Sequence, residues 1–221
     1  MSRYLEGLES RTLFAAAPPV ATATLVGADL QVVGTKRADD IHVRLSADSL
    51  NVEVAHNGTV IASHAVGVIA MVTVDAGKGH DNVHVDANVQ VNAHLTGGIG
   101  NDTLVGSALG LNVLIGGNGK DNLTGGTLAD VLQGDNGNDI LVSGAGDDNL
   151  NGGNGKDSLD AGAGNDIVVG GNGRDALTGG EGADNFAGND KVWEFRDLNG
   201  VEDTYSINID FGDLFPDIWP F

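Results

Sequence analysis

The sequence contains no cysteine and only four prolines among its 221 residues. Without cysteine the chain has neither disulfide bonds nor thiolate metal sites, so an oxygen-liganded ion is the remaining kind of cross-link. Aromatic residues make up only 5% of the chain, which excludes a core anchored mainly by bulky rings. No run approaches the roughly 18 apolar residues of a membrane-spanning helix, so we expect no transmembrane segment. The short apolar stretch 12–17 does not predict a standard signal peptide.

Basic residues are also scarce, with 11 Lys and Arg against 31 Asp and Glu, giving a formal net charge of -20. Such a charge excludes nucleic acid and anionic membranes as partners. Cations are the natural partners instead. The hydrophobic content of 41% disfavours a disordered chain, so something must neutralise the carboxylates of a folded one.

What the chain has in excess is glycine, with 35 residues, and between 97 and 187 it follows a nine-residue repeat. Each unit begins with a glycine-rich turn. The sixth position of nearly every unit is Asp: Asp102, Asp121, Asp130, Asp139, Asp148, Asp157, Asp166, Asp175 and Asp184. The unit 106–114 lacks this Asp, and one extra residue, assigned to Ile115, follows it.

The eighth position is apolar in every unit, as in Leu141, Leu150 and Val113, and polar residues surround it. This alternation predicts a short strand with one buried face after each turn. Consecutive strands should lie on opposite sides of a flattened coil, so that two units, 18 residues, complete one coil. The expected fold is all-β, a right-handed parallel β-roll or β-helix solenoid.

The turns have the composition that calcium requires, namely carboxylates and backbone carbonyls converging on one point. Glycine permits left-handed dihedrals and close approach of neighbouring turns. The glycines expected to shape the metal sites are Gly97, Gly116, Gly134, Gly152, Gly170 and Gly179 at the first position; Gly98, Gly117, Gly144, Gly153, Gly162, Gly171 and Gly180 at the second; and Gly100, Gly119, Gly137, Gly146, Gly155, Gly164, Gly173 and Gly182 at the fourth.

One turn offers too few ligands, so each ion should lie between two turns stacked 18 residues apart. The Asp residues then form two columns. The first column is Asp102, Asp121, Asp139, Asp157 and Asp175, and the second column is Asp130, Asp148, Asp166 and Asp184. Adjacent pairs predict up to about seven Ca²⁺ ions, with weaker sites beside the extra residue and beside Thr127-Leu128-Ala129, which lacks the fourth glycine. Stacked carboxylates repel one another, so folding should require the metal.

The unit G-G-x-G-x-D with an apolar residue two places on, as in Gly152-Gly153-Asn154-Gly155-Lys156-Asp157-Ser158-Leu159, resembles the RTX or haemolysin-type calcium-binding repeat family. The resemblance implies a secreted, extracellular protein that binds calcium and folds upon export. It does not imply toxicity. In that family an acidic, apolar C-terminal segment is recognised by a type I exporter.

The chain outside the repeats divides into three segments. Residues 1–23 are an expected flexible leader, in which Leu8, Glu9 and Arg11 resemble the LExR motif of exported bacterial surface proteins. Residues 24–96 keep strand alternation and are expected to form irregular β-helix rungs of the same solenoid. They contain two degenerate repeats, 34–42 and 76–84, whose calcium binding the sequence leaves open. Residues 188–221 are aromatic and acidic, as expected of a C-terminal cap or export signal.

Three other interpretations compete with a structural or adhesive calcium-binding protein. The first is a polysaccharide-active β-helix enzyme of the lyase kind, although no H-E-x-x-H or G-x-S-x-G motif occurs, and we expect no enzyme. The second is zinc or copper binding by the six histidines between 42 and 94, whose spacing does not indicate ligands on one element. The third is an extracellular glycan bound by the fifth-position cations Lys120, Lys156 and Arg174, whose simpler role is local charge relief.

Overall fold

The computed structural model describes residues 20–188, 194–197 and 204–207, and none of these residues is helical. In this part of the chain no helix is therefore long and apolar enough to cross a membrane. The expected leader motif at Leu8, Glu9 and Arg11 lies outside the described residues, as does most of the segment 188–221.

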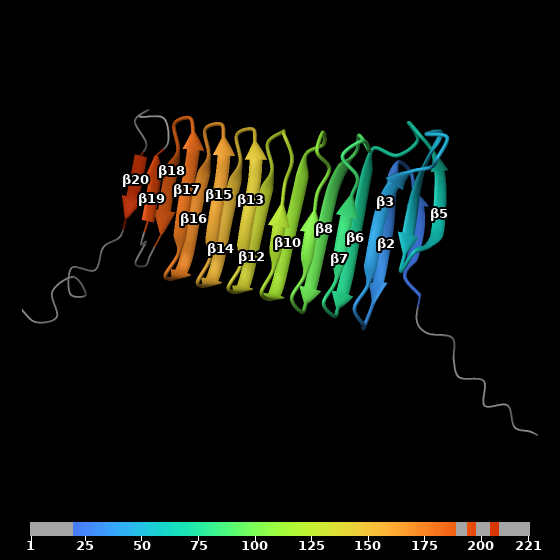
Figure 1. Cartoon of the computed structure of the whole chain (residues 1–221), viewed down its shortest axis with the longest axis horizontal. Helices are drawn as coiled ribbons and strands as arrows, with labels where there is room; N and C mark the ends of the chain where they lie inside the picture. Colours follow the sequence, from blue (N-terminus) through green and yellow to red (C-terminus); the bar gives the residue numbers. More distant parts are fainter. Residues whose placement is uncertain (1–19, 189–193, 198–203, 208–221) are drawn as a thin grey trace, which may run out of the picture.

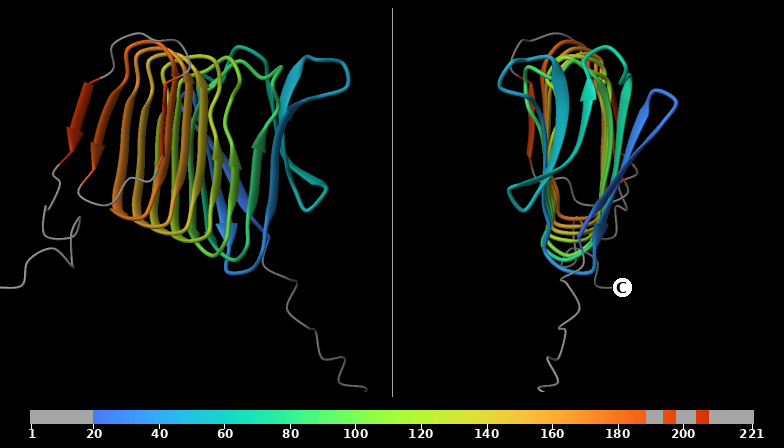
Figure 2. Two further views of the ribbon diagram at one scale, coloured as in Figure 1. Left: turned by 60° about the vertical axis from the view of Figure 1, so that its left-hand side comes forward. Right: turned by 90° about the vertical axis from the view of Figure 1, so that its right-hand side faces the viewer.

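The described strands form two ten-stranded sheets that face each other across a flattened coil (Figures 1 and 2). Sheet A has the order β1 (Thr22–Val26), β2 (Asp29–Thr35), β6 (Met71–Lys78), β8 (Asn92–Ile99), β10 (Asn112–Gly119), β12 (Val131–Gly137), β14 (Asn149–Gly155), β16 (Ile167–Gly173), β18 (Asn185–Gly188) and β20 (Thr204–Ile207). Sheet B has the order β19 (Glu194–Asp197), β17 (Ala176–Glu181), β15 (Ser158–Ala163), β13 (Ile140–Ala145), β11 (Asn122–Thr124), β9 (Thr103–Val105), β7 (Asn82–Val85), β3 (Asp40–Leu45), β4 (Asn51–His56) and β5 (Thr59–Ala65). The chain alternates between the sheets through the repeats, which gives the elongated stack of coils in Figure 1.

The strand register confirms the 18-residue coil of a parallel β-roll. In sheet B, Leu141 lies beside Leu159, and Leu159 lies beside Leu177, with the strands parallel. The same offset occurs in sheet A, where Leu132 lies beside Leu150. Because paired residues are 18 positions apart, which is two repeats, each side chain lies beside the residue at the same repeat position in the next coil.

In the repeats the core is a row of large apolar side chains between the sheets, one from each strand, whereas N-terminal strands such as β2, with Leu30 and Val32, contribute two or more. The eighth residues of the repeats are at most 1% exposed in Leu104, Leu123, Leu132, Leu141, Leu150, Leu159, Val168, Leu177 and Phe186. Because inward and outward residues alternate along a strand, one apolar residue per unit suffices to fill this narrow interior. A broad aromatic core is therefore not needed.

The assignment of Ile115 as the extra residue, with Val113 as the inward one, is wrong. Leu114 is the buried residue, and it lies beside Leu95 and Leu132 in register. The additional residue lies in the turn between Gly106 and Asn112, so Asn112 occupies the place that Asp holds in other units. A turn tolerates an insertion, whereas one residue added within a strand would direct every later side chain to the opposite face.

Residues 24–96, expected to form irregular rungs of the same solenoid, combine parallel rungs with antiparallel hairpins. The pairs β2–β6, β6–β8 and β3–β7 continue the parallel roll, but β1, β4 and β5 pair antiparallel with their neighbours. The β4–β5 turn has positive φ at Asn57 and Gly58, the combination that a tight hairpin turn requires. These hairpins lie at the N-terminal end of the stack (Figure 2).

Candidate metal centre

The Asp residues of the repeats gather at the two edges of the roll, where the chain passes from one sheet to the other. Those of the first column precede strands of sheet B, and those of the second column precede strands of sheet A. Every carboxylate in both columns belongs to a residue that is at most 3% exposed. The structure thus brings together the Asp residues that the 18-residue spacing predicted to stack.

Consecutive Asp residues in a column are linked by one hydrogen bond per coil. The backbone N–H of Asp121 donates to Oδ1 of Asp139, and that of Asp139 donates to Oδ1 of Asp157, each at 2.8 Å. The second column repeats this pattern, with the N–H of Asp148 donating to Oδ1 of Asp166 at 2.8 Å. Oδ1 of each of these carboxylates is held by this hydrogen bond, and Oδ2 takes no part in it.

The other oxygen, Oδ2, is buried and lacks a hydrogen-bond partner among the described residues in Asp81, Asp102, Asp121, Asp139, Asp148, Asp157 and Asp166. A buried polar atom left in this way costs at least about 1 to 3 kcal/mol, and more when it carries charge. A column of them is sustainable only if a positively charged partner neutralises the oxygens.

Burial has a corresponding effect on the proton affinity of these groups. Burial raises the pKa of Asp139 from 3.8 to about 7, with smaller upward contributions from the charges of Asp121 and Asp157 and an opposing one from the hydrogen bond donated by the N–H of Asp121. Desolvation likewise raises the pKa of Asp121, Asp157 and Asp166 to about 6. Burial therefore opposes the charged form of these carboxyl groups, and a cation bound beside them would favour it.

The glycines make these turns as tight as the sequence predicted, but the three positions act differently. Gly153 and Gly155, at the second and fourth positions, have φ of 99° and 152°, which side chains rarely adopt. A Cβ on Gly155 would overlap the carbonyl oxygen of Gly137 in the preceding coil. Gly152, at the first position, has ordinary φ, but a Cβ there would lie 2.6 Å from Oδ2 of Asp157.

The Cβ position of Gly152 also lies 2.6 Å from the carbonyl oxygen of Gly170, one coil further on. Carboxylate and carbonyl oxygens from neighbouring coils thus converge where the first glycine leaves space. Gly134 has the same surroundings, with Oδ2 of Asp139 at 2.5 Å and the carbonyl oxygen of Gly152 at 2.6 Å from its Cβ position. An all-oxygen donor set of anionic carboxylates and carbonyls suits calcium, so the residues fit this ion.

The first column extends beyond the regular repeats into the degenerate repeat 76–84. The N–H of Asp81 donates to Oδ1 of Asp102 at 2.8 Å, and Asp81 is 2% exposed. Its Oδ2 lacks a hydrogen-bond partner, as in the regular turns. Asp81 is the sixth residue of the degenerate repeat 76–84, but it precedes Asp102 by 21 residues, so the 18-residue spacing alone does not predict that the two stack.

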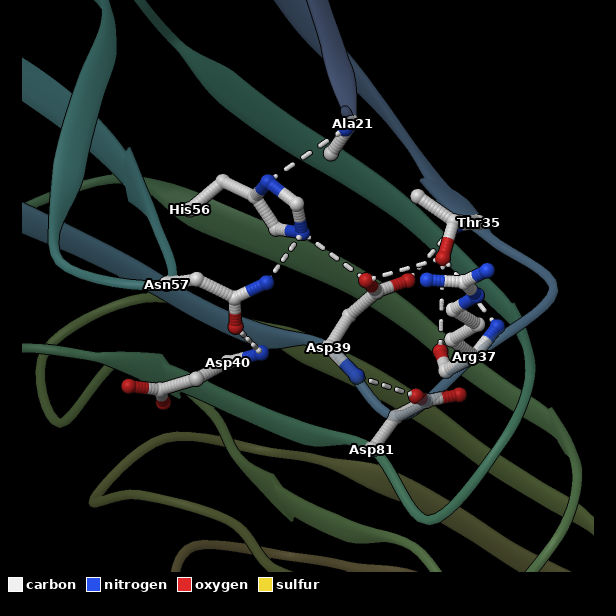
Figure 3. Close-up of polar contacts among 8 residues, drawn as sticks. All are labelled: Ala21, Thr35, Arg37, Asp39, Asp40, His56, Asn57 and Asp81. Carbon is white, nitrogen blue, oxygen red and sulfur yellow. Dashed lines mark hydrogen bonds and ion pairs between the residues drawn. The ribbon is translucent and has the colours of Figure 1, made fainter. Parts of the chain in front are cut away.

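The column ends at Asp39, in the degenerate repeat 34–42, where protein groups satisfy the carboxylate (Figure 3). Nε2 of His56 donates to Oδ1 of Asp39 at 2.8 Å, and the N–H of Thr35 donates to Oδ2 at 2.5 Å. The N–H of Asp39 donates to Oδ1 of Asp81 at 2.8 Å. Asp39 therefore occupies a column position, but both of its carboxylate oxygens have hydrogen-bond partners. His56 ends the column in this way, a role that the sequence did not predict.

The second column begins at Asp130 in a similar way. Oδ1 of Asp130 accepts hydrogen bonds from the backbone and side chain of Asn112, at 2.8 and 2.9 Å. Oδ2 accepts the N–H of Gly126 at 2.6 Å. Both oxygens of Asp130 therefore have hydrogen-bond partners within the protein, as in Asp39.

Comparison with protein families finds four copies of the RTX calcium-binding nonapeptide repeat, three that overlap at residues 96–132, 115–150 and 124–159, and a fourth at 160–190. The matched residues span both Asp columns and end at β18. No curated protein and no solved structure matches the chain.

Proposed function

We propose, from the premise that residues 96–190 are RTX calcium-binding nonapeptide repeats, that stacked turns of this roll hold two columns of Ca²⁺ ions. The observation that supports this most strongly is the row of buried Oδ2 oxygens without hydrogen-bond partners in the described turns. Each ion lies between adjacent coils and takes carboxylates of the column and carbonyls of the glycine-rich turns. The two columns of the repeats hold up to about seven ions, and Asp81 adds a site at the start of the first column.

Calcium is proposed to drive folding because the metal-free columns oppose it. Two unit charges about 4.8 Å apart repel by roughly 1 kcal/mol even in water, and burial strengthens the repulsion. If each site meets calcium at ten times its dissociation constant, binding stabilises the fold by about 1.4 kcal/mol per site. Seven sites contribute about 10 kcal/mol, which equals the whole stability of an ordinary domain.

This dependence fits a secreted, extracellular protein with a structural or adhesive role, possessing no catalytic activity. Sites built for millimolar calcium stay empty inside a cell and fill outside it. Export by a type I system and attachment to a glycan or surface belong to this proposal. One cavity, beside Leu45, Ile69 and Val91, has no titratable side chain in its lining, so it offers no general acid or base for a lyase-like reaction.

Equilibrium dialysis with radioactive calcium tests the proposal, alongside a crystal structure grown in calcium. The expected result is about seven or eight ions per chain, placed between consecutive Asp residues of each column. One or two ions per chain, or ions outside the columns, would overturn it. Incubation of the calcium-loaded protein with uronic-acid polymers tests the enzymatic alternative, since unsaturated products would contradict a purely structural role.

A further inference from the structure

The outer face of sheet B carries a second cluster of metal-ligand residues, far simpler than the calcium columns. His42 in β3 lies directly beside His84 in β7 in the parallel register, although 42 residues separate them in the sequence. Asp86 follows β7 immediately. The ligand atoms of the three side chains all lie within 4.8 Å of one another.

The backbone fixes each of these side chains on the outer face. The residues flanking His42, namely Ile41 and Val43, are fully buried in the core, so alternation directs His42 outward. Val83 and Val85 place His84 in the same way.

The position of Asp86 is fixed by two backbone hydrogen bonds. Its N–H donates to the carbonyl oxygen of Val43, and its own carbonyl oxygen accepts the N–H of Val89, both at 2.9 Å. The cluster therefore stands on rigid elements, and the two histidines cannot separate without disrupting the core.

The distances approach those of a tetrahedral metal site. Zinc bound to two imidazole nitrogens and one carboxylate at about 2.0 to 2.2 Å requires ligand atoms about 3.3 Å apart. Nε2 of His84 lies 3.4 Å from Oδ1 of Asp86, which meets this requirement. Nε2 of His42 lies 2.5 Å from the same oxygen, with a hydrogen bond in place of the metal, so that contact must open by about 0.8 Å.

The chemistry of this cluster selects a different metal from the calcium columns. Two imidazoles and one carboxylate suit zinc, copper or nickel, whereas calcium requires six to eight oxygens. Side-chain exposures of 37%, 40% and 31% for His42, His84 and Asp86 leave a path for the ion and for a water ligand. The nearest cation on this face of β3, Arg44, pairs with Glu53 at 3.3 Å, which offsets its charge.

We propose that His42, His84 and Asp86 form a binding site for one transition-metal ion of the zinc class, with water completing the coordination. The site lies at the opposite end of β7 from Asp81, so it is separate from the first column. Zinc and calcium therefore occupy the protein together. The inference rests on the geometry of sheet B and not on the ion count of the columns.

Titration of zinc into the calcium-saturated full-length chain by calorimetry tests this site, because excess calcium blocks zinc from the columns. The expected result is one zinc ion per chain, with at least about a tenfold loss of affinity in His42→Ala and in His84→Ala. His94→Ala is the matched control, since His94 lies in sheet A beside Thr73 and Val113. It should bind zinc as the unaltered chain does.

A second measurement separates ligation from a change in folding. Cobalt substituted for zinc should give a visible absorption band that His42→Ala and Asp86→Asn abolish, while circular dichroism in calcium stays unchanged. Zinc binding that survives both His42→Ala and His84→Ala, or that excess calcium displaces, would overturn the proposal. If one alanine variant unfolds, the other variant and Asp86→Asn still decide the question.

Discussion

Replacing Asp148 by Asn removes one charge from the middle of the second column with almost no change in shape. Asp148 is 2% exposed, and its Oδ1 accepts the N–H of Asp130 at 2.7 Å. Its Oδ2 is one of the buried oxygens without a hydrogen-bond partner among the described residues. Asp130 and Asp166 lie one coil away on either side, so the substitution should weaken two calcium sites at once.

The expected loss follows from the binding energy of those two sites. At a free calcium concentration ten times the dissociation constant, two sites contribute about 3 kcal/mol to the free energy of unfolding. The loss should shrink as calcium is lowered. Without calcium the substitution should not destabilise the fold, because burial raises the pKa of Asp148 and Asn avoids the cost of a buried charge.

Asp147→Asn is the matched control, one residue away and with the same loss of charge. Asp147 is exposed, and Asn138 and Asn165 already occupy its position in other units. Its effect should stay within about 0.5 kcal/mol. Urea denaturation at several fixed calcium concentrations measures both variants. Equal losses in the two variants, or a loss in Asp148→Asn that does not vary with calcium, would refute the reasoning.

Three further predictions concern pH, the turns and the end of the first column. Because the folded-state pKa of Asp121 and Asp139 is raised from 3.8 to about 6 and 7, stability of the calcium-free roll is fully present below about pH 4 and is lost as pH rises through 6 to 7. In chelating-resin-treated buffer the β-sheet signal in circular dichroism should therefore grow from pH 7.5 to 5, whereas in calcium the melting temperature should fall over the same range because protons compete with the ion; changes of the same sign would contradict this. Gly155→Ala should destabilise the calcium-loaded protein by more than about 3 kcal/mol in urea denaturation, while Gly27→Ala, with φ of 65° and open space around its Cβ position, should cost about 1 kcal/mol; similar costs would contradict the tight stacking of the turns. Asp81→Asn should remove about one calcium ion per chain in equilibrium dialysis and Asp39→Asn none, and an equal ion count in both variants would place the end of the column elsewhere.

The repeat made much of the fold predictable, because a fixed nine-residue period determines which residues stack. The 18-residue coil, the buried apolar row and the alignment of the Asp columns follow from it. The prediction was wrong at the one unit, 106–114, that departs from this period. The extra residue was assigned to Ile115 because the turn after Gly106 has no Asp to mark its register.

The N-terminal third could not be predicted at this level because no regular spacing relates its strands. The hairpin strands β4 and β5, and then β6, come between β3 and β7 in the sequence, although β3 and β7 are neighbours in sheet B, so His42 lies beside His84 only in three dimensions. The role of His56 at Asp39 depends on the same hairpin. Judging the histidines by their spacing along the chain therefore missed both arrangements.

Calcium is proposed to complete the buried columns and so to drive folding. Calcium titration followed by far-ultraviolet circular dichroism tests this directly. The metal-free chain at pH 7.5 is expected to be largely unfolded, and calcium should convert it cooperatively to β-structure. Magnesium should fail at the same concentrations, because it demands a compact octahedral geometry that stacked carbonyl turns do not provide. A full β-sheet spectrum in excess chelator, or equal folding by magnesium, would contradict the account.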